Sequence, residues 1–339
     1  MAQAVVRSRF VWHELMTTDT KSAAAFFSKL IGWKTQVAPQ DKSYTLFLDG
    51  SRQAAGLMAL PEDAKAMGAP PSWLSYIGTP DVDKTARQAA SLGGKVLRPP
   101  TDIPTVGRFA VLQDPQGAAF AAFTPASGGQ APAGDPGVGE YSWHELMTTD
   151  RAAAFSFYQN LFGWEATGTM EMGPQGTYQM FGLDGKAFGG MFKADPMPGP
   201  PMWLPYVRVA DVTKAAATIT SLGAKVINGP MTIPDGDMIV QALDAQGAMF
   251  ALHSKPAAAG KAAPAKAKPA AQARTRAARP KKKAKAAKAK APKAKAPKAK
   301  AKKAKAPKVK AKKKATRRKA KAAKPRARAK ARGRTRRRR

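Results

Sequence analysis

The first third of the chain alternates short apolar runs with longer stretches in which apolar residues recur at helical spacing. The run from Phe10 to Thr17 predicts a strand, and Asp19 predicts the N-cap of a helix that ends at Gly32. A second helix is predicted to begin at Asp81 and to stop at Gly93. Further strands are predicted over 44–48, 54–60, 73–77, 95–97, 109–113 and 118–123.

This pattern occurs twice in the sequence. Phe10–Asp19 returns 131 positions later as Tyr141–Asp150, and the offset stays between 130 and 135 through the Asp-x-Gln-Gly turns at 114–117 and 244–247. A fixed repeat about 115 residues long suits a complete domain rather than a solenoid unit. Each repeat divides again into two halves with the order strand, helix, three strands. We therefore predict an α+β fold containing four such units.

Five segments follow from the repeats and from composition. They are an N-terminal extension (1–8), a first domain (9–126), a flexible linker (127–139), a second domain (140–255) and a basic tail (256–339).

The formal charge of +36 resides in the tail. Residues 256–339 hold 38 of the 58 Lys and Arg residues and no Asp or Glu, which leaves 20 basic and 22 acidic residues, a net charge of −2, for 1–255. Because the tail has no aromatic residue, it cannot bury enough apolar surface to offset the entropy of ordering, and we expect it to be disordered when free.

Several functional classes are excluded or disfavoured. With no cysteine, the chain has no disulfide, thiolate zinc site or cysteine nucleophile. The N-terminus lacks a signal-peptide core, and no run approaches 18 apolar residues. We also find no Gly-rich phosphate loop and no nucleophile elbow. These features favour a cytoplasmic protein without a membrane partner.

A duplicated βαβββ unit, with an Asp-capped helix ending in Leu-x-Gly-Trp and an Asp-x-Gln-Gly turn before the last strand, resembles the vicinal oxygen chelate superfamily of glyoxalase, bleomycin-resistance and extradiol-dioxygenase proteins. The likeness covers nearly all of 9–254. It implies two tandem glyoxalase-like domains, each a pair of βαβββ modules whose sheet forms a cup. It also implies a divalent metal held by residues of the first, middle and last strands.

The metal positions are filled by residues that do not bind cations. Counted from the helix-capping Asp and from the Asp of the last turn in each repeat, these positions hold Trp12 and Trp143, Leu74 and Leu204, and Ala121 and Ala251. We therefore predict no metal and no cofactor, with a divalent metal held elsewhere as the alternative. His13 and His144 are expected under the helices as satisfied histidines, and His253 as structural or exposed.

Glu14 and Glu145 are the candidate catalytic or binding residues. A carboxylate beside Trp on an apolar cup could bind a cationic or hydroxylated ligand or act as a base, or could pair with an arginine such as Arg208. The predicted cup residues are Trp12, Glu14, Met16, Tyr76, Arg108, Trp143, Glu145, Met147, Tyr206 and Arg208. Trp33, Trp73, Trp164 and Trp203 are expected in packing.

The tail resembles the Lys/Ala/Pro-rich tails of linker histones and bacterial histone-like proteins. Alternating Lys and Ala with spaced Pro favours binding to a polyanion without recognition of its base sequence. Nucleic acid is therefore the predicted partner, with DNA preferred over RNA, and we expect association with the nucleoid. The densest positions are Lys281, Lys282, Lys283, Lys312, Lys313, Lys314, Arg317, Arg318, Arg336, Arg337, Arg338 and Arg339.

Three functions stay open from the sequence. The first is a metal-free small-molecule-binding protein tethered to nucleic acid by its tail. The second is a superfamily enzyme, a lyase or oxidoreductase with an atypical site, and the third is a nucleoid-associated structural protein. The chain is expected to be a monomer with an internal pseudo-dimer, or a homodimer.

Overall fold

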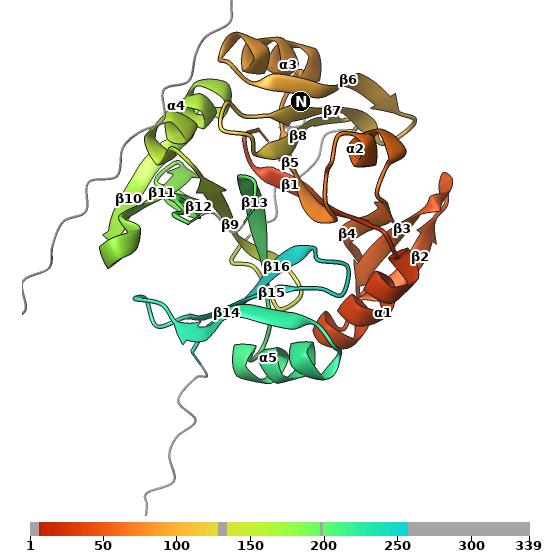
Figure 1. Cartoon of the computed structure of the whole chain (residues 1–339). Helices are drawn as coiled ribbons and strands as arrows, with labels where there is room; N and C mark the ends of the chain where they lie inside the picture. Colours follow the sequence, from red (N-terminus) through yellow and green to blue (C-terminus); the bar gives the residue numbers. More distant parts are fainter. Residues whose placement is uncertain (1–6, 128–133, 197–198, 257–339) are drawn as a thin grey trace, which may run out of the picture. The chain divides into compact units, whose positions relative to one another are not determined.

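The computed structural model describes residues 7–127, 134–196 and 199–256, which lie in one compact unit (Figure 1). The linker segment 128–133 and the tail from 257 onward, with the nucleic-acid-binding residues predicted there, lie outside the described residues.

Each repeat contains the predicted order of elements. The first comprises β1 (Phe10–Thr17), α1 (Thr20–Ile31), β2 (Lys34–Ala38), β3 (Asp41–Asp49), β4 (Arg52–Ala59), α2 (Glu62–Ala66), β5 (Ser72–Gly78), α3 (Val82–Ser91), β6 (Lys95–Ile103), β7 (Gly107–Gln113) and β8 (Ala119–Pro125). The second comprises β9 (Tyr141–Thr148), α4 (Arg151–Phe162), β10 (Glu165–Glu171), the 3-10 turn η1 (Gly173–Gln175), β11 (Thr177–Leu183), β12 (Lys186–Lys193), β13 (Met202–Arg208), α5 (Val212–Ser221), β14 (Lys225–Thr232), β15 (Met238–Leu243) and β16 (Met249–Ser254).

Each repeat forms one eight-stranded sheet. The orders are β2-β3-β4-β1-β5-β8-β7-β6 and β10-β11-β12-β9-β13-β16-β15-β14, so the two βαβββ halves join edge to edge through β1–β5 or β9–β13. This confirms the α+β class and the tandem arrangement of paired modules. Strand β2 was missed as a separate prediction because four of its five residues are exposed, which leaves no apolar alternation to detect.

Aspartates begin the four long helices. Asp19, Asp81, Asp150 and Asp211 each accept a hydrogen bond from the backbone N–H three residues later, at 2.8–3.0 Å. Helices α1 and α4 end at glycines with φ of 92° and 73°, a left-handed conformation that residues with a Cβ rarely adopt.

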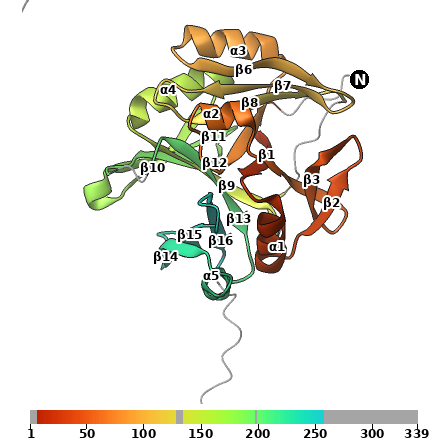
Figure 2. The same ribbon diagram turned by 45° about the vertical axis from the view of Figure 1, so that its right-hand side comes forward.

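The helices cover one face of each sheet, and the repeats pack together through these faces (Figures 1 and 2). Phe27 of α1 lies 5.3 Å, ring to ring, from Phe250 of β16, and Tyr158 of α4 lies 5.4 Å from Phe120 of β8. Each first half therefore shares a core with the second half of the other repeat. The opposite face of each sheet, which we call the inner face, corresponds to the predicted cup.

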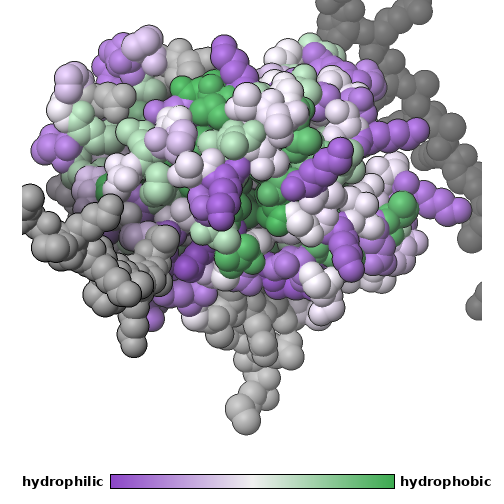
Figure 3. Space-filling view, turned by 90° about the horizontal axis from the view of Figure 1, so that it is seen from below, coloured by the Kyte–Doolittle hydropathy of each residue, from purple (hydrophilic) through white to green (hydrophobic). Residues whose placement is uncertain are grey.

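Large exposed hydrophobic residues are scattered among the described residues. On the face shown in Figure 3, apolar residues form small separate patches between hydrophilic ones. No helix of the described residues is long and apolar enough to cross a membrane.

Candidate ligand-binding site

Strand alternation places one buried carboxyl on each inner face. Along β9, Trp143 and Met147 join the inner-face cluster of the second repeat, while Leu146 packs into the core between the repeats. Glu145 lies between those two inner-face residues and is 7% exposed. In the first repeat Trp12 and Met16 likewise join the inner-face cluster, and Glu14 is also 7% exposed.

Neutral donors surround the carboxyl of Glu145. Tyr206 Oη donates to Oε1 at 3.0 Å, Tyr178 Oη donates to Oε2 at 3.2 Å, and Gln241 Nε2 donates to Oε1 at 3.0 Å. Trp143 Nε1 donates to Tyr178 Oη at 2.7 Å and holds that tyrosine in place. No described arginine or lysine forms an ion pair with this carboxyl.

The first repeat contains the same group with fewer donors. Tyr76 Oη donates to Glu14 Oε1 at 3.1 Å, and Trp12 Nε1 donates to Tyr44 Oη at 3.0 Å. Val111 occupies the position that corresponds to Gln241. A Trp-Tyr-Glu-Tyr arrangement is therefore common to both inner faces, and the amide donor is present only in the second.

A glycine opposite each carboxyl leaves room for one of the tyrosines. Gly56 pairs with Glu14, and a Cβ at Gly56 would lie 1.8 Å from Tyr44 Oη. Gly190 pairs with Glu145, and a Cβ there would lie 2.0 Å from Tyr178 Cε1. The tyrosine rings thus lie directly against the sheet, which brings their hydroxyls toward the carboxyls.

Burial dominates the protonation of both carboxyls. Desolvation raises the pKa of Glu145 to about 7, although the hydrogen bonds from Tyr206, Tyr178 and Gln241 oppose the shift. Desolvation also raises the pKa of Glu14, against hydrogen bonds from its tyrosines and the field of Arg98. A carboxyl that titrates near neutral pH can accept or donate a proton under physiological conditions.

Tyr44, Tyr178 and Gln241 were missed by sequence reasoning. The two tyrosines align between the repeats, at an offset of 134, and this signal could have found them. Gln241 has no counterpart in the first repeat, so only the structure reveals its role.

Arg108 does not lie where it was predicted, and Arg208 lacks the ion pair with Glu145 that the sequence left open. Arg108 lies on the helix side of β7, where its guanidinium contacts Asp83 of α3 at 2.7 Å and Asp102 at 2.7 Å, because its neighbour Phe109 takes the inner face. Arg208 does not pair with Glu145. Its guanidinium donates to the carbonyl of Pro136 in the segment that precedes β9.

His13 and His144 form a buried pair between the repeats, which we call the histidine pair. Their Nε2 atoms lie 3.2 Å apart, His144 Nδ1 donates to the Phe188 carbonyl at 3.0 Å, and His13 Nδ1 lies 3.1 Å from Ser75 Oγ. Since a carbonyl only accepts, His144 must accept from His13 Nε2–H, and His13 Nδ1 must accept from Ser75. Both rings are satisfied, as expected, and burial lowers their pKa values, that of His144 to about 4.

His253 is held by hydrogen bonds at the end of β16. Its Nε2 lies 2.6 Å from Asp237 Oδ2, and its Nδ1 lies 2.9 Å from Ser142 Oγ. This agrees with the structural role expected for it.

The strand pairing allows the metal positions to be tested. Across the first sheet Trp12 pairs with Tyr76, which pairs with Ala121, while Leu74 lies opposite Glu14. The second sheet repeats this as Trp143, Tyr206 and Ala251. The described residues contain no group of three or more His, Cys, Asp or Glu side chains placed to hold an ion. These side chains do not fit a divalent metal, and the absence of a metal stays a prediction.

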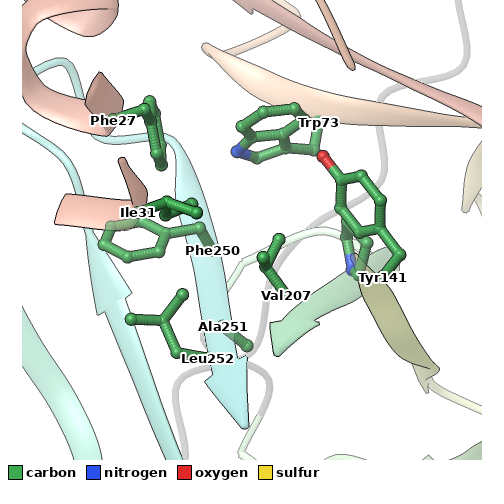
Figure 4. A pocket seen from close by; sticks show the side chains of 9 residues that line it. Phe27, Ile31, Trp73, Tyr141, Val207, Phe250, Ala251 and Leu252 are labelled. Carbon is green, nitrogen blue, oxygen red and sulfur yellow. The ribbon is translucent and has the colours of Figure 1, made fainter. Parts of the chain in front are cut away.

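A separate apolar pocket, which neither Glu14 nor Glu145 lines, lies between the repeats (Figure 4). It has a volume of about 210 Å³ including its open mouth. It is lined by Phe27, Ile31, Trp73, Tyr141, Pro205, Val207, Phe250, Ala251 and Leu252. The indole Nε1 of Trp73 is buried there without a hydrogen-bond partner among the described residues.

The sequence profile of the Glyoxalase/Bleomycin resistance protein/Dioxygenase superfamily matches residues 9–121 and 141–252, that is, both repeats. The chain belongs to this superfamily. It is similar to CFP32 of Mycobacterium tuberculosis, a protein named as a glyoxylase, with 31% identity over 250 residues that cover 73% of this chain and 94% of CFP32. It is also similar to the anthracycline biosynthesis protein DnrV of Streptomyces peucetius, with 29% identity and coverage of 74% and 96%.

Solved structures share the fold of this superfamily member. A Mn(II)-bound glyoxalase from Novosphingobium aromaticivorans matches with a TM-score of 0.52 at 14% identity, covering 75% of this chain and 83% of that one. Homoprotocatechuate 2,3-dioxygenase from Brevibacterium fuscum matches with a TM-score of 0.54 at 14% identity, covering 75% and 82%. At these identities the likeness extends to the fold alone.

Proposed function

We propose that the two inner faces bind small organic molecules and that Glu145 and Glu14 are their polar anchors. The observation that carries this proposal is the environment of Glu145, a carboxyl on an apolar face held by three neutral donors and by no described cation. A buried carboxyl costs stability unless it is paired, and no cationic side chain among the described residues balances a negative charge there. A hydroxylated or cationic ligand would supply the missing interaction.

The proposal includes binding without a metal ion. It is supported by the tryptophan, leucine and alanine side chains at the superfamily's metal positions in both repeats, none of which can coordinate a cation.

Native mass spectrometry and elemental analysis of the purified full-length protein test this proposal. We expect a retained or added organic ligand without stoichiometric metal, and weaker retention in Glu145→Gln with unchanged folding. Asp184→Asn, at an exposed turn residue, is the control. Stoichiometric zinc, iron, manganese or nickel would overturn the metal-free part, and ligand uptake that Glu145→Gln leaves unchanged would overturn the anchoring role.

A second candidate function is that of a superfamily enzyme in which Glu145 acts as a general base. It is favoured by the pKa of Glu145 at about 7, which suits proton transfer at neutral pH, and by the glyoxylase name of the relative CFP32. Turnover should then rise with pH through an apparent pKa near 7, and Glu145→Gln should abolish that limb. A pH profile unchanged in this variant would assign the residue to binding.

For the tail we propose nucleic-acid binding through phosphate neutralisation. The support is its composition, 38 basic and no acidic residues over 256–339. If about ten side chains neutralise DNA phosphates, log K should fall against log salt with a slope of about −9. Deleting 256–339 should remove DNA binding, and retention of binding by the remainder would place the interface on the repeats. If the deletion leaves ligand uptake intact, the repeats are more than a spacer for the tail.

A further inference from the structure

The inner faces of the two repeats differ in charge at one strand, although their carboxyls match. Strand β6 of the first repeat places Arg98 where β14 of the second places Asn228. Asn228 Nδ2 donates to Gln241 Oε1 at 3.2 Å, and Gln241 in turn donates to Glu145. The second repeat therefore surrounds its carboxyl with a chain of uncharged hydrogen-bonding groups and no cation among the described residues.

Arg98 makes a different set of contacts. Its guanidinium carbon lies 5.2 Å from the centre of the Phe109 ring, a member of the inner-face cluster, while the side chain stays exposed. Stacking on an aromatic ring fixes the plane of the guanidinium and leaves its N–H groups available. No carboxylate of the described residues forms an ion pair with it.

The surrounding residues make this guanidinium useful to a ligand. Because Val111 stands where the second repeat has Gln241, Glu14 accepts hydrogen bonds from hydroxyl groups but from no side-chain amide. The positive charge of Arg98 acts on this carboxyl and lowers its pKa, against the larger effect of burial. Trp12, Phe123 and Phe109 supply apolar surface on the same inner face.

We propose that the inner face of the first repeat binds a small organic anion, with Arg98 contacting its carboxylate or sulfonate group and Glu14 a polar group at the other end. The inner face of the second repeat takes an uncharged molecule. This assignment rests on the function proposed above and adds the ligand class of each repeat.

A matched pair of dyes tests the assignment on the full-length protein. 1-Anilinonaphthalene-8-sulfonate carries a sulfonate, and N-phenyl-1-naphthylamine has the same rings without the charge. Energy transfer from tryptophan reports binding to the two repeats, because all six tryptophans lie there and none lies in the tail. The variants Trp12→Phe and Trp143→Phe show which repeat contributes the signal.

Arg98→Asn installs the residue of the second repeat. We expect it to weaken binding of the sulfonate dye at the first repeat about tenfold or more, the typical effect of losing a charge-assisted hydrogen bond. Binding of the neutral dye should change less than twofold. Arg87→Asn, which removes an exposed arginine from α3, is the control for net charge and should leave both affinities unchanged. The reciprocal Asn228→Arg should add sulfonate binding that Trp143→Phe diminishes.

Each outcome separates the two proposals. If both dyes bind the first repeat and Arg98→Asn affects neither, the anion assignment is wrong while ligand binding stands. An equal loss of sulfonate binding in the Arg87 control would also overturn the assignment, since net charge alone would then explain it. If neither dye binds near Trp12 or Trp143, ligand binding at the inner faces is itself overturned.

Discussion

Phe27→Tyr is expected to stabilise this protein, because two buried polar atoms beside Phe27 have no hydrogen-bond partner among the described residues and the new hydroxyl would bond to both. In the second repeat the equivalent ring is Tyr158, whose hydroxyl accepts from Trp203 Nε1 at 2.9 Å and donates to Asp114 Oδ2 at 3.1 Å. The corresponding atoms around Phe27, Trp73 Nε1 and Asp244 Oδ2, are both buried without a partner among the described residues.

The geometry allows the substitution. The Phe27 and Trp73 rings lie 5.3 Å apart at 84°, and the Tyr158 and Trp203 rings lie 5.1 Å apart at 81°, so the added hydroxyl should reach the same position. Phe27 and Trp73 also line the pocket between the repeats, which provides space (Figure 4).

Two new hydrogen bonds, one to a charged group, favour folding by about 1 and 1.5–3 kcal/mol, from which the cost of burying the hydroxyl is subtracted. We expect a net gain of about 1–2 kcal/mol, and a rise in Tm of roughly 2–4 °C per kcal/mol for a body of this size.

Denaturant unfolding of the full-length protein, followed by tryptophan fluorescence, measures this difference. The matched control is Tyr158→Phe, which should cost about 1.5–3 kcal/mol by leaving Trp203 Nε1 and Asp114 Oδ2 unpaired. The reasoning is refuted if Phe27→Tyr fails to stabilise while Tyr158→Phe is also neutral, because the hydroxyl would then have no energetic role in either repeat.

Three further predictions concern titration and the fit of the tyrosines. The pKa of Glu145 is raised from 4.5 to about 7 in the folded state, so its contribution to stability is fully present below pH 4.5 and is lost as pH rises through 7. In urea titrations, the free energy of unfolding of Glu145→Gln should therefore rise by up to about 3 kcal/mol relative to that of the parent between pH 4 and 8. The histidine pair has lowered pKa values, so its contribution to the free energy of unfolding is present above pH 6.5 and is lost as pH falls toward 4. Replacing both histidines by glutamine should therefore reduce the loss of stability between pH 6.5 and 4, and an unchanged loss would assign it to other groups. Gly190→Ala should displace the Tyr178 ring and destabilise the protein by about 1–3 kcal/mol, whereas Gly199→Ala, which meets nothing within 4 Å, should not; calorimetry of both variants would expose an equal effect.

Most of the fold could be predicted from the sequence, because its signals are local and are written twice. The Asp caps, the apolar spacing of α1 and α3, and the glycines at helix ends are properties of neighbouring residues, and the repeat doubles the evidence for each. Strand alternation was also sufficient to place Glu14, Trp12 and Met16 on one face, where the structure has them. Strand β2 escaped because an exposed edge strand carries no apolar pattern.

Only the tertiary structure decided which side chains meet. Arg108 turned to the helix face because the register of β7 gives the inner face to Phe109, and register depends on strand pairing rather than on local composition. The contacts of Glu145 with Tyr178 and Gln241 join strands that are far apart in the sequence, so no spacing rule predicts them. The sequence by itself determined the repeated architecture through short-range periodicity, and the packing of distant strands determined the chemistry of its two inner faces.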